Sequence, residues 1–279
     1  MILVTGANGN VGSFVCQSLV ALGAEGTFIK AVTRPSPETT QRRLDFLDSD
    51  TFDAALEGIR KVFLVRPPAL AKPDRDMLPF LQACQNKNIS QLVFLSLQGV
   101  EHNTITPHAK IESLIKQLGL PYTFLRPSFF MQNLTMQHRE EITHDDVLFM
   151  PAGDGKTNFI DARDIAEVAA AVLLQEGHIN KAYELTGSDS YSYYEVAQML
   201  TDALNRPIRY ARPGFLRYLI HSLRKGMPIS FALVTGIIYT VARLGNADRY
   251  SPELTTLLAR QPTPLSQFIE EHIEFWKKT

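Results

Sequence analysis

The residues best suited to chemistry stand near the start of the chain, in the segment Thr5-Gly6-Ala7-Asn8-Gly9-Asn10-Val11-Gly12. This segment has the spacing G-x-x-G-x-x-G, follows a short apolar run and precedes a helical pattern. Gly6 permits a tight turn, Gly9 lets the backbone approach a pyrophosphate, and Gly12 lets the helix pack closely on the strand. The N–H groups and the dipole of the first helical turn favour phosphate. We therefore predict a dinucleotide site contacted by residues 6–12; an ordinary strand-turn-helix is the alternative.

The end of the second predicted strand bears on which cofactor is bound. NAD-selective sites place an Asp or Glu about 20 residues beyond the glycine turn, where it binds the ribose 2′-hydroxyl. Here the sequence reads Ala31-Val32-Thr33-Arg34-Pro35, without a carboxylate. Because an arginine can pair with a 2′-phosphate through charge-assisted hydrogen bonds, Arg34 predicts a preference for NADP(H) over NAD(H). A solvent-exposed arginine at a strand end is the alternative.

Short apolar runs alternate with helical patterns in the first half of the chain, and these elements must position the two motifs. Continuous runs rich in Val, Ile, Leu and Phe are typical of strands that are covered on both faces. They occupy residues 2–5, 28–33, 44–46, 61–65, 91–97 and 122–125. Strands that alternate with helices predict right-handed βαβ units and a parallel sheet. The expected fold class is therefore α/β, a Rossmann-type doubly wound parallel sheet with a small, mostly helical C-terminal substrate lobe.

The second half of the chain has fewer long periodic segments. Asp164-Ile-Ala-Glu167 and Ser192-Tyr-Tyr-Glu195 match capping boxes that open helices. Residues 182–186 predict a last strand of the same sheet. We expect one sheet-based domain whose later crossings are decorated by a small lobe. The NAD(P)-binding core covers residues 1–128, with sheet and helix elements returning at about 158–187, and the substrate-binding lobe covers residues 129–157 and 188–279.

Composition excludes several classes of function. The 279 residues include 28 Lys+Arg and 29 Asp+Glu, so the net charge of −1 gives no reason to expect a nucleic-acid partner. Cys16 and Cys84 cannot form a disulfide framework and are expected to be buried as small hydrophobes. The longest apolar stretch, residues 229–242, is shorter than the about 20 residues that span a bilayer, and predicts a buried helix or a pocket wall. We expect a cytoplasmic monomer or homodimer without a membrane partner, acting on an apolar or aromatic small molecule.

Longer segments resemble one known family. They are the glycine turn, Arg34, Asp45-Phe46, Val62-Phe-Leu-Val-Arg-Pro-Pro68, Tyr122-Thr-Phe-Leu-Arg-Pro-Ser-Phe-Phe-Met-Gln-Asn133, Asp161-Ala-Arg-Asp-Ile-Ala166 and residues 264–276. Together they resemble the NmrA-like group of atypical short-chain dehydrogenases/reductases over essentially the whole chain. The stretch over residues 125–133 is the most specific part of this resemblance.

The resemblance implies further contacts with the cofactor and the substrate. They are Asp45 and Phe46 at the adenine, Arg66 and Pro67 beside the cofactor after the fourth strand, Ser96 near the nicotinamide, Pro127 at the nicotinamide end, and Phe129 and Phe130 at the start of the substrate pocket. For Asp45 and Arg66 the alternative is a solvated charge. For Phe129 and Phe130 it is packing in the core.

The Tyr-x-x-x-Lys pair of short-chain dehydrogenases is incomplete in this chain. The corresponding residues read Thr106-Pro-His-Ala-Lys110. Lys110 could keep the ribose contact, but the hydroxyl of Thr106 has too high a pKa to replace the phenol as an acid. His108 could supply a proton, because the pKa of histidine lies near neutrality; otherwise the substrate needs little protonation. A surface histidine and a solvated lysine are the alternatives, and no metal-ligand spacing is present.

Two functions fit these residues. The first is an NAD(P)H-dependent reductase that transfers hydride to a small apolar acceptor, such as a quinone, azo group or iminium, without the usual tyrosine acid. Residues that could wall its pocket, or simply form core, are Phe215, Tyr218, Leu219, Met227, Phe231 and Tyr239. The alternative is a non-catalytic NAD(P) redox sensor that acts through a protein partner.

Overall fold

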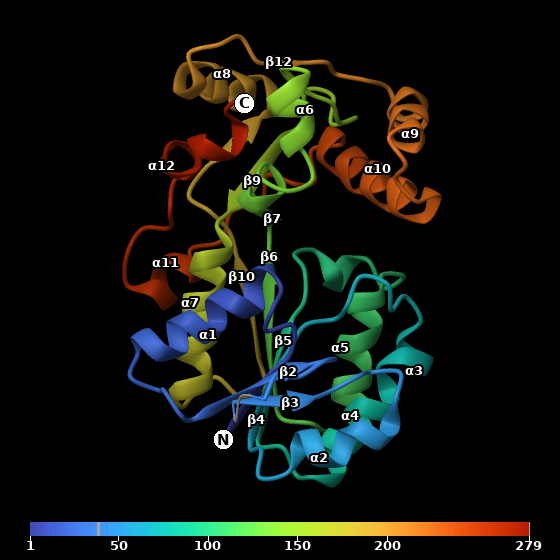
Figure 1. Cartoon of the computed structure of the whole chain (residues 1–279), viewed down its shortest axis with the longest axis vertical. Helices are drawn as coiled ribbons and strands as arrows, with labels where there is room; N and C mark the ends of the chain where they lie inside the picture. The colour runs from blue at the N-terminus through green and yellow to red at the C-terminus, as the bar shows by residue number, and fades with distance from the viewer. Residues whose placement is uncertain (38–39, 279) are drawn as a thin grey trace. The chain divides into compact units, whose positions relative to one another are not determined.

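The computed structural model describes residues 1–37 and 40–278. The chain divides into two compact units, each with its own elements (Figure 1). The first unit comprises residues 1–127, 162–185 and 253–260, and the second comprises residues 128–161, 186–252 and 261–279.

A seven-stranded parallel sheet forms the centre of the first unit. Its strand order is β10-β6-β5-β4-β1-β2-β3. The strands are β1 (Ile2–Val4), β2 (Phe28–Val32), β3 (Gln41–Arg43), β4 (Lys61–Leu64), β5 (Gln91–Leu95), β6 (Tyr122–Pro127) and β10 (Lys181–Leu185). Successive strands build outward in opposite directions from β1 and β4, and this reversal is the topological switch point where α/β sheets bind ligands. The predicted Rossmann-type doubly wound fold is confirmed.

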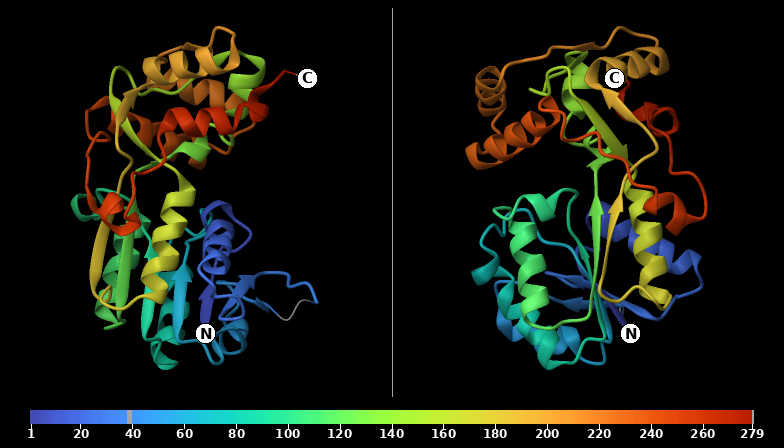
Figure 2. Two further views of the ribbon diagram at one scale, coloured as in Figure 1. Left: turned by 90° about the vertical axis from the view of Figure 1, so that its left-hand side faces the viewer. Right: turned by 180° about the vertical axis from the view of Figure 1, so that it is seen from behind.

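Helices cover both faces of this sheet (Figure 2). One face carries α1 (Asn10–Ala21), α7 (Ala162–Leu174) and α11 (Glu253–Leu258), and the other carries α2 (Phe52–Leu56), α3 (Pro73–Asp76), α4 (Leu78–Asn86) and α5 (Pro107–Gln117). Every residue of β5 is buried, as expected of a strand that is covered on both sides. Single turns of 3₁₀ helix, η1 (Ser49–Thr51) and η2 (Val100–His102), complete the unit.

The third strand lies three residues before its predicted position. The strand is Gln41–Arg43; Leu44 follows it, and residues 45–48 form a tight turn that a bridge between Asp45 and Asp48 closes. Leu44 is buried and the half-buried ring of Phe46 packs edge-on against Phe80, with ring centroids 5.1 Å apart. The prediction was wrong because β3 is an edge strand, which needs no apolar run, while the apolar residues after it fill the core from a turn.

The first unit also includes residues 253–260, which the sequence assigned to the lobe. Glu253 accepts a hydrogen bond from the backbone N–H of Glu184 at 2.6 Å, so α11 is attached to β10. Arg260 pairs with Asp164 and Glu167 on α7. Since α7 begins two residues before Asp164, the expected capping box at this helix is wrong, and Asp164 forms an ion pair instead.

The second unit contains two small sheets and a set of helices. One sheet has the order β11-β9-β7 and the other joins β12 to β8. The strands are β7 (Phe129–Phe130), β8 (Val147–Leu148), β9 (Lys156–Ile160), β11 (Ser190–Ser192) and β12 (Arg209–Tyr210); the helices are η3 (Met131–Asn133), α6 (Arg139–His144), α8 (Tyr193–Leu204), α9 (Phe215–Arg224), α10 (Ile229–Arg243), α12 (Leu265–Glu271) and η4 (Ile273–Trp276). The capping box of Ser192 and Glu195 at the start of α8 is confirmed. Because β9 belongs to this unit, the return to the first unit starts with α7 rather than at about residue 158.

The sequence predicts a buried helix or a pocket wall over residues 229–242; α10 is not a buried helix, and Phe231 on it lines a cavity. Its buried residues are Ala232, Thr235, Gly236, Tyr239 and Ala242, all on one side. The opposite side consists of large apolar residues that are exposed. Within the described residues, no helix is both long enough and apolar enough to cross a membrane.

Candidate functional site

The glycine turn leaves no room for side chains at its key positions. Gly6 has φ of +63°, a conformation that L residues rarely adopt. A Cβ atom on Gly12 would lie 2.2 Å from the carbonyl oxygen of Gly6, and one on Gly9 would lie 3.1 Å from the same atom. The packing of the turn against α1 therefore excludes a side chain at Gly12, Gly9 is closely packed, and Gly6 needs its left-handed backbone conformation. The backbone geometry is therefore that of a dinucleotide-binding turn.

Thr5 fixes this turn at the switch point of the sheet. Its side chain is buried, its backbone N–H donates to the carbonyl of Phe63 at 2.9 Å, and its hydroxyl accepts from the N–H of Val65 at 2.8 Å. Both bonds cross from β1 to β4 and the residue that follows it. The turn is thus held where the carboxyl ends of the two strands diverge.

The N-terminus of α1 is open to an anion. Its N-cap residue is Gly9, which has no side chain to cap the helix. The N–H groups of the first helical turn have no intrahelical acceptor, and the helix dipole makes this end positive. A pyrophosphate fits such a site because it can accept these hydrogen bonds.

Arg34 follows β2 by two residues and is exposed. Among residues 1–37 and 40–278, nothing forms a hydrogen bond or an ion pair with its guanidinium. Asp45 and Phe46, by contrast, are engaged locally. The carboxylate of Asp45 accepts from the N–H of Leu47 at 3.0 Å, and Phe46 packs on the core as described above. Of the three, Arg34 keeps its full hydrogen-bonding capacity for a ligand.

Arg66 organises the loop after β4. Its Nη1 donates to the carbonyl oxygens of Pro67 at 3.0 Å, Pro68 at 3.1 Å and Leu70 at 3.0 Å. Its Nε is buried without a partner, and burial lowers the pKa of the group below its ordinary value. The solvated-charge alternative is therefore wrong for Arg66. A buried N–H without an acceptor is costly, which fits a ligand oxygen at this position.

A buried ionic network underlies Ser96. Its hydroxyl donates to Glu112 Oε1 at 2.7 Å, and Glu112 receives two hydrogen bonds from Arg126, at 3.0 Å from Nε and 2.7 Å from Nη2. Arg126 also lies 3.2 Å from Glu101. The hydroxyl proton of Ser96 is thus committed to a carboxylate, and the oxygen can only accept from a ligand. No role was expected for Glu112 or for Arg126, although Arg126 stands in the stretch that resembles the family. A glutamate among the apolar positions of α5 was the available signal for this ion pair.

His108 and Lys110 both lie on α5 but on different faces, since residues two apart do not face the same side of a helix. His108 stacks on Phe94 with ring centroids 6.0 Å apart. Burial and the nearby charge of Arg66 lower the pKa of His108 to about 4, so its ring is neutral near pH 7. The Nζ of Lys110 lies 3.4 Å from Asp74 and is about half exposed. Thr106 is the N-cap residue, its hydroxyl accepting from the N–H of Ala109 at 3.2 Å.

Most predicted cofactor residues follow the carboxyl ends of neighbouring parallel strands. The glycine turn follows β1, Arg34 follows β2, Arg66 and Pro67 follow β4, Ser96 follows β5, and Pro127 is the last residue of β6. The sheet therefore brings this group to one edge, whereas Phe129 and Phe130 belong to β7 in the second unit. Both are half-buried, and the ring of Phe129 lies 6.2 Å from that of Tyr239.

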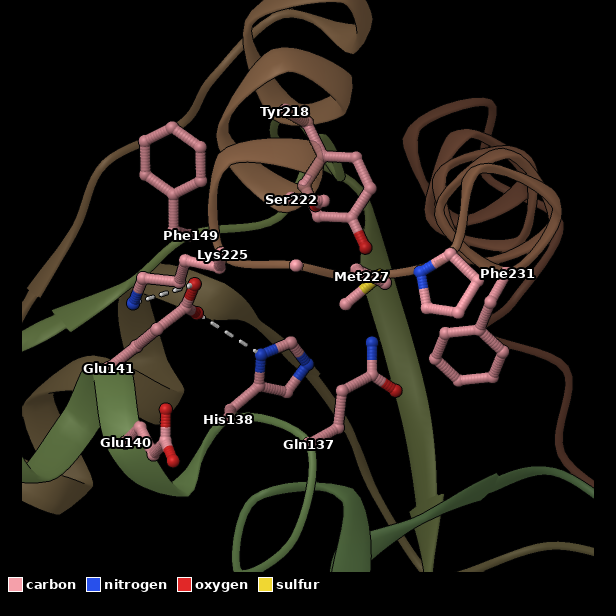
Figure 3. A pocket seen from close by; sticks show the side chains of 12 residues that line it. Gln137, His138, Glu140, Glu141, Phe149, Tyr218, Ser222, Lys225, Met227 and Phe231 are labelled. Carbon is pink, nitrogen blue, oxygen red and sulfur yellow. Dashed lines mark hydrogen bonds and ion pairs between the residues drawn. The ribbon is translucent and has the colours of Figure 1, made fainter.

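The second unit contains a cavity of about 310 Å³ (Figure 3). Its apolar lining includes Phe149, Tyr218, Met227, Pro228 and Phe231, and its polar lining includes Gln137, His138, Glu141, Ser222 and Lys225. Tyr218, Met227 and Phe231 were among the predicted pocket walls; Phe215, Leu219 and Tyr239 do not line it. The Gln137 amide points into the cavity in Figure 3, and its Nε2 is buried without a partner.

A chain of hydrogen-bonded and ion-paired side chains forms part of the lining of this cavity and continues beyond it. The buried His138 shares a hydrogen bond of 2.5 Å with the hydroxyl of Tyr239 and lies 3.4 Å from Glu141 on its other side. Glu141 also lies 3.0 Å from His221 and 3.7 Å from Lys225. Burial opposes ionisation of Glu141, but these neighbours outweigh it and hold the pKa of the carboxyl below its ordinary value. The sequence assigned no role to His138; its spacing of three residues from Glu141 was the available signal.

The family model of the NmrA-like family matches residues 1–269, which is nearly the whole chain and includes the glycine turn and both units. The chain belongs to the NmrA-like family. The NmrA-like protein is 32% identical to the NAD(P)H azoreductase of Xenophilus azovorans over 256 residues, covering 87% of each chain. It is 26% identical to prestalk A differentiation protein A of Dictyostelium discoideum over 279 residues, covering 97% of this chain and 91% of the relative.

Among solved structures, the NmrA-like protein has the fold of an NADPH-dependent quinone oxidoreductase of Escherichia coli in complex with NADPH. The TM-score is 0.90 at 23% identity, covering 98% of this chain and 100% of the other. The agreement extends over both units, so the resemblance that the sequence suggested is confirmed for the family and for the fold.

Proposed function

We propose that this NmrA-like protein is a reductase that prefers NADP(H) and transfers hydride to a small apolar acceptor, such as a quinone, an azo group or an iminium, without the usual tyrosine acid. The observation that carries the proposal is the glycine turn. A Cβ on Gly12 would lie 2.2 Å from the backbone of the turn, Gly6 has a left-handed conformation, and the turn presents the open N-terminus of α1 at the switch point of the sheet. A turn packed this way leaves backbone rather than side chains at the place where a pyrophosphate binds.

The family and the relatives make the chain an oxidoreductase of the atypical short-chain dehydrogenase type. When bound, the nicotinamide cofactor supplies the hydride. The residues at the sheet edge bind and orient it: the turn holds the pyrophosphate, Arg34 holds the 2′-phosphate, and the unpartnered Nε of Arg66 donates to a cofactor oxygen. Lys110, at about half exposure, holds a ribose hydroxyl once it leaves Asp74.

The protonation states of His108 and Ser96, at the carboxyl edge of the sheet, limit the class of acceptor that the protein can reduce. His108 is neutral near pH 7, so it does not serve as an imidazolium acid there. The hydroxyl of Ser96 donates to Glu112 and has no proton to give. An acceptor that takes hydride without enzymatic protonation suits these residues best, which supports quinones, azo compounds and iminium ions over simple ketones.

The cofactor assignment is tested by Arg34→Ala. We expect the Kd for NADPH to rise about 10- to 100-fold, because a charge-assisted hydrogen bond contributes about 1.5–3 kcal/mol. The Kd for NADH should stay unchanged. Arg209→Ala, at an exposed position of β12, is the matched control. An NADPH to NADH affinity ratio that stays at the wild-type value in Arg34→Ala would contradict the proposal.

The reaction is tested by NADPH oxidation with a panel of quinones, azo dyes and iminium salts, each measured against a blank without acceptor. Turnover with at least one class is expected. If the whole panel is silent while NADPH binds tightly, the reductase proposal fails.

That outcome would favour the second candidate, a redox sensor. Two observations support it: Thr106 stands where short-chain dehydrogenases carry the tyrosine, and one relative is named for a differentiation process rather than a reaction. Pull-downs with NADP⁺, NADPH and no cofactor are the test. A set of partners that is the same in all three conditions would count against a sensor.

A further inference from the structure

Helices α9 and α10 carry an apolar face that no described part of the chain covers. We define the hairpin face as ten large apolar residues whose side chains are between 37% and 72% exposed. They are Leu216, Ile220 and Leu223 on α9, Ile229, Leu233, Val234, Ile237, Ile238 and Val241 on α10, and Leu244 after it. Exposed apolar residues usually occur singly, and a continuous group marks an interaction surface.

The spacing shows that this face is one surface of each helix. Ile229, Leu233, Ile237 and Val241 recur every four residues along α10, while the residues that α10 buries lie between them. On α9, Leu216, Ile220 and Leu223 follow the same helical spacing. The two helices pack against each other, and Figure 1 shows them as an adjoining pair. The hairpin is therefore amphipathic, with its apolar side turned to solvent.

The segment that contains the hairpin carries charge of one sign, although Glu141 on α6 and Asp145 at its end contact Lys225 at the end of α9. Residues 203–247 contain seven Lys and Arg and no Asp or Glu, in a chain whose total charge is almost balanced. Arg217, Arg224, Lys225 and Arg243 lie on the hairpin or at its ends and are exposed. Lys225 pairs with Asp145 at 3.0 Å, whereas no acidic side chain among the described residues pairs with the three arginines. Arg217 lies over the ring of Phe149, 5.8 Å from its centroid, and within the part of the chain that the structure describes the three arginines have no ionic partner that would compete with an outside one.

An apolar face bordered by unpaired arginines fits the surface of an anionic bilayer. Amphipathic helices of this kind lie in the membrane interface, with apolar side chains in the acyl boundary and basic side chains at the headgroups. A second copy of the chain fits less well, because a two-fold contact through this face would place the same positive charges opposite each other. We propose that the α9–α10 hairpin docks the protein on anionic membranes.

This mode of binding needs no spanning helix. The sequence predicted no membrane partner because residues 229–242 are too short to cross a bilayer, but that argument does not apply to a helix lying in its surface. The hairpin also supplies Met227 and Phe231 to the lining of the 310 Å³ cavity. An apolar molecule dissolved in the bilayer would meet this cavity next to the docked face.

Co-sedimentation with vesicles tests the proposal without using turnover. The full chain is mixed with vesicles of phosphatidylcholine alone, or of equal phosphatidylcholine and phosphatidylglycerol. We expect binding to the mixed vesicles only, weakened by salt. Ile237→Gln should weaken it about tenfold, since it removes a buried isoleucine from the acyl boundary. Arg217→Gln and Arg224→Gln should each weaken it about fivefold.

The control is Ile179→Gln, which makes the same change at a residue 50% exposed in the first unit and should bind as the wild type does. Thermal unfolding and NADPH affinity of each variant show that folding and the cofactor site are intact. Absence of binding to the mixed vesicles would overturn the proposal, as would equal binding by Ile237→Gln. A concentration-dependent dimer that Ile237→Gln abolishes, without vesicle binding, would assign the face to a second copy instead.

Discussion

Replacing Gly12 with alanine tests the reasoning about the glycine turn most directly. The new Cβ would lie 2.2 Å from the carbonyl oxygen of Gly6 and 2.6 Å from its carbonyl carbon, whereas ordinary contact begins at 3.4 Å. Both obstructing atoms belong to the backbone, so no side-chain rotation relieves the clash. Either α1 or the turn must therefore move by about 1 Å.

The expected magnitudes follow from this displacement. Overpacking costs about 1–3 kcal/mol, and the better helix propensity of alanine offsets up to about 1 kcal/mol of it. We expect a net loss of about 1–2 kcal/mol in the free energy of unfolding, and a melting temperature lower by about 2–8 °C. If the turn binds the pyrophosphate as proposed, a shift of about 1 Å also breaks hydrogen bonds to it. Two such bonds, at about 1.5 kcal/mol each, correspond to a rise in the Kd for NADPH of about 100-fold.

Two further glycines provide the comparison. Gly9→Ala places its Cβ 3.1 Å from the same oxygen and should give a smaller effect of the same kind. Gly214→Ala is the control, because its Cβ meets nothing within 4 Å and its φ of −72° suits alanine. Thermal unfolding of the cofactor-free protein and fluorescence titration with NADPH measure both quantities. If Gly12→Ala has the same melting temperature as Gly214→Ala and a Kd for NADPH within about twofold of wild type, the account of the turn is refuted.

Three other predictions concern buried polar groups. The pKa of His108 is about 4 in the folded protein and near its ordinary 6.5 when unfolded, so the ring destabilises the fold as the pH falls from 6.5 to 4. His108→Gln should therefore reduce the loss in the free energy of unfolding between these two pH values by roughly 3 kcal/mol, measured by urea unfolding at each. Glu112→Gln leaves Arg126 without its bidentate partner and should lower the free energy of unfolding by about 3 kcal/mol in urea. Tyr239→Phe leaves His138 short of a partner and should cost about 1–3 kcal/mol by the same measurement.

Each of these has its own control or contrary result. For His108, the change in the free energy of unfolding between the two pH values is compared between wild type and variant, since other groups titrate in the same range. An equal change in both proteins would contradict the burial of the ring. For Glu112, the more exposed Glu101→Gln should cost less than about 1 kcal/mol, and equal effects would contradict the network. For Tyr239, a variant as stable as wild type would mean that the hydrogen bond contributes nothing.

The first half of the fold could be predicted because its signals are local. An apolar run, the spacing of the glycines and the residues that follow β2 can each be recognised within a few residues. A continuous apolar run bounded by turn residues is typical of a parallel strand that is covered on both faces. The glycine turn is the clearest case, since the spacing that the sequence displays is the spacing that the backbone contacts require. The prediction was wrong where a local pattern does not determine the structure, as at β3, an edge strand that needs no apolar run.

The sequence by itself determined the class of fold, the family and the position of the glycine turn. Tertiary structure alone decided which polar groups meet: His138 and Tyr239 are 101 residues apart, and Arg126 reaches Glu112 across a strand–helix contact. It also decided that the apolar residues of α10 face outward. Periodicity marks an apolar face of a helix, but whether that face meets a core or the solvent depends on what the rest of the chain places against it.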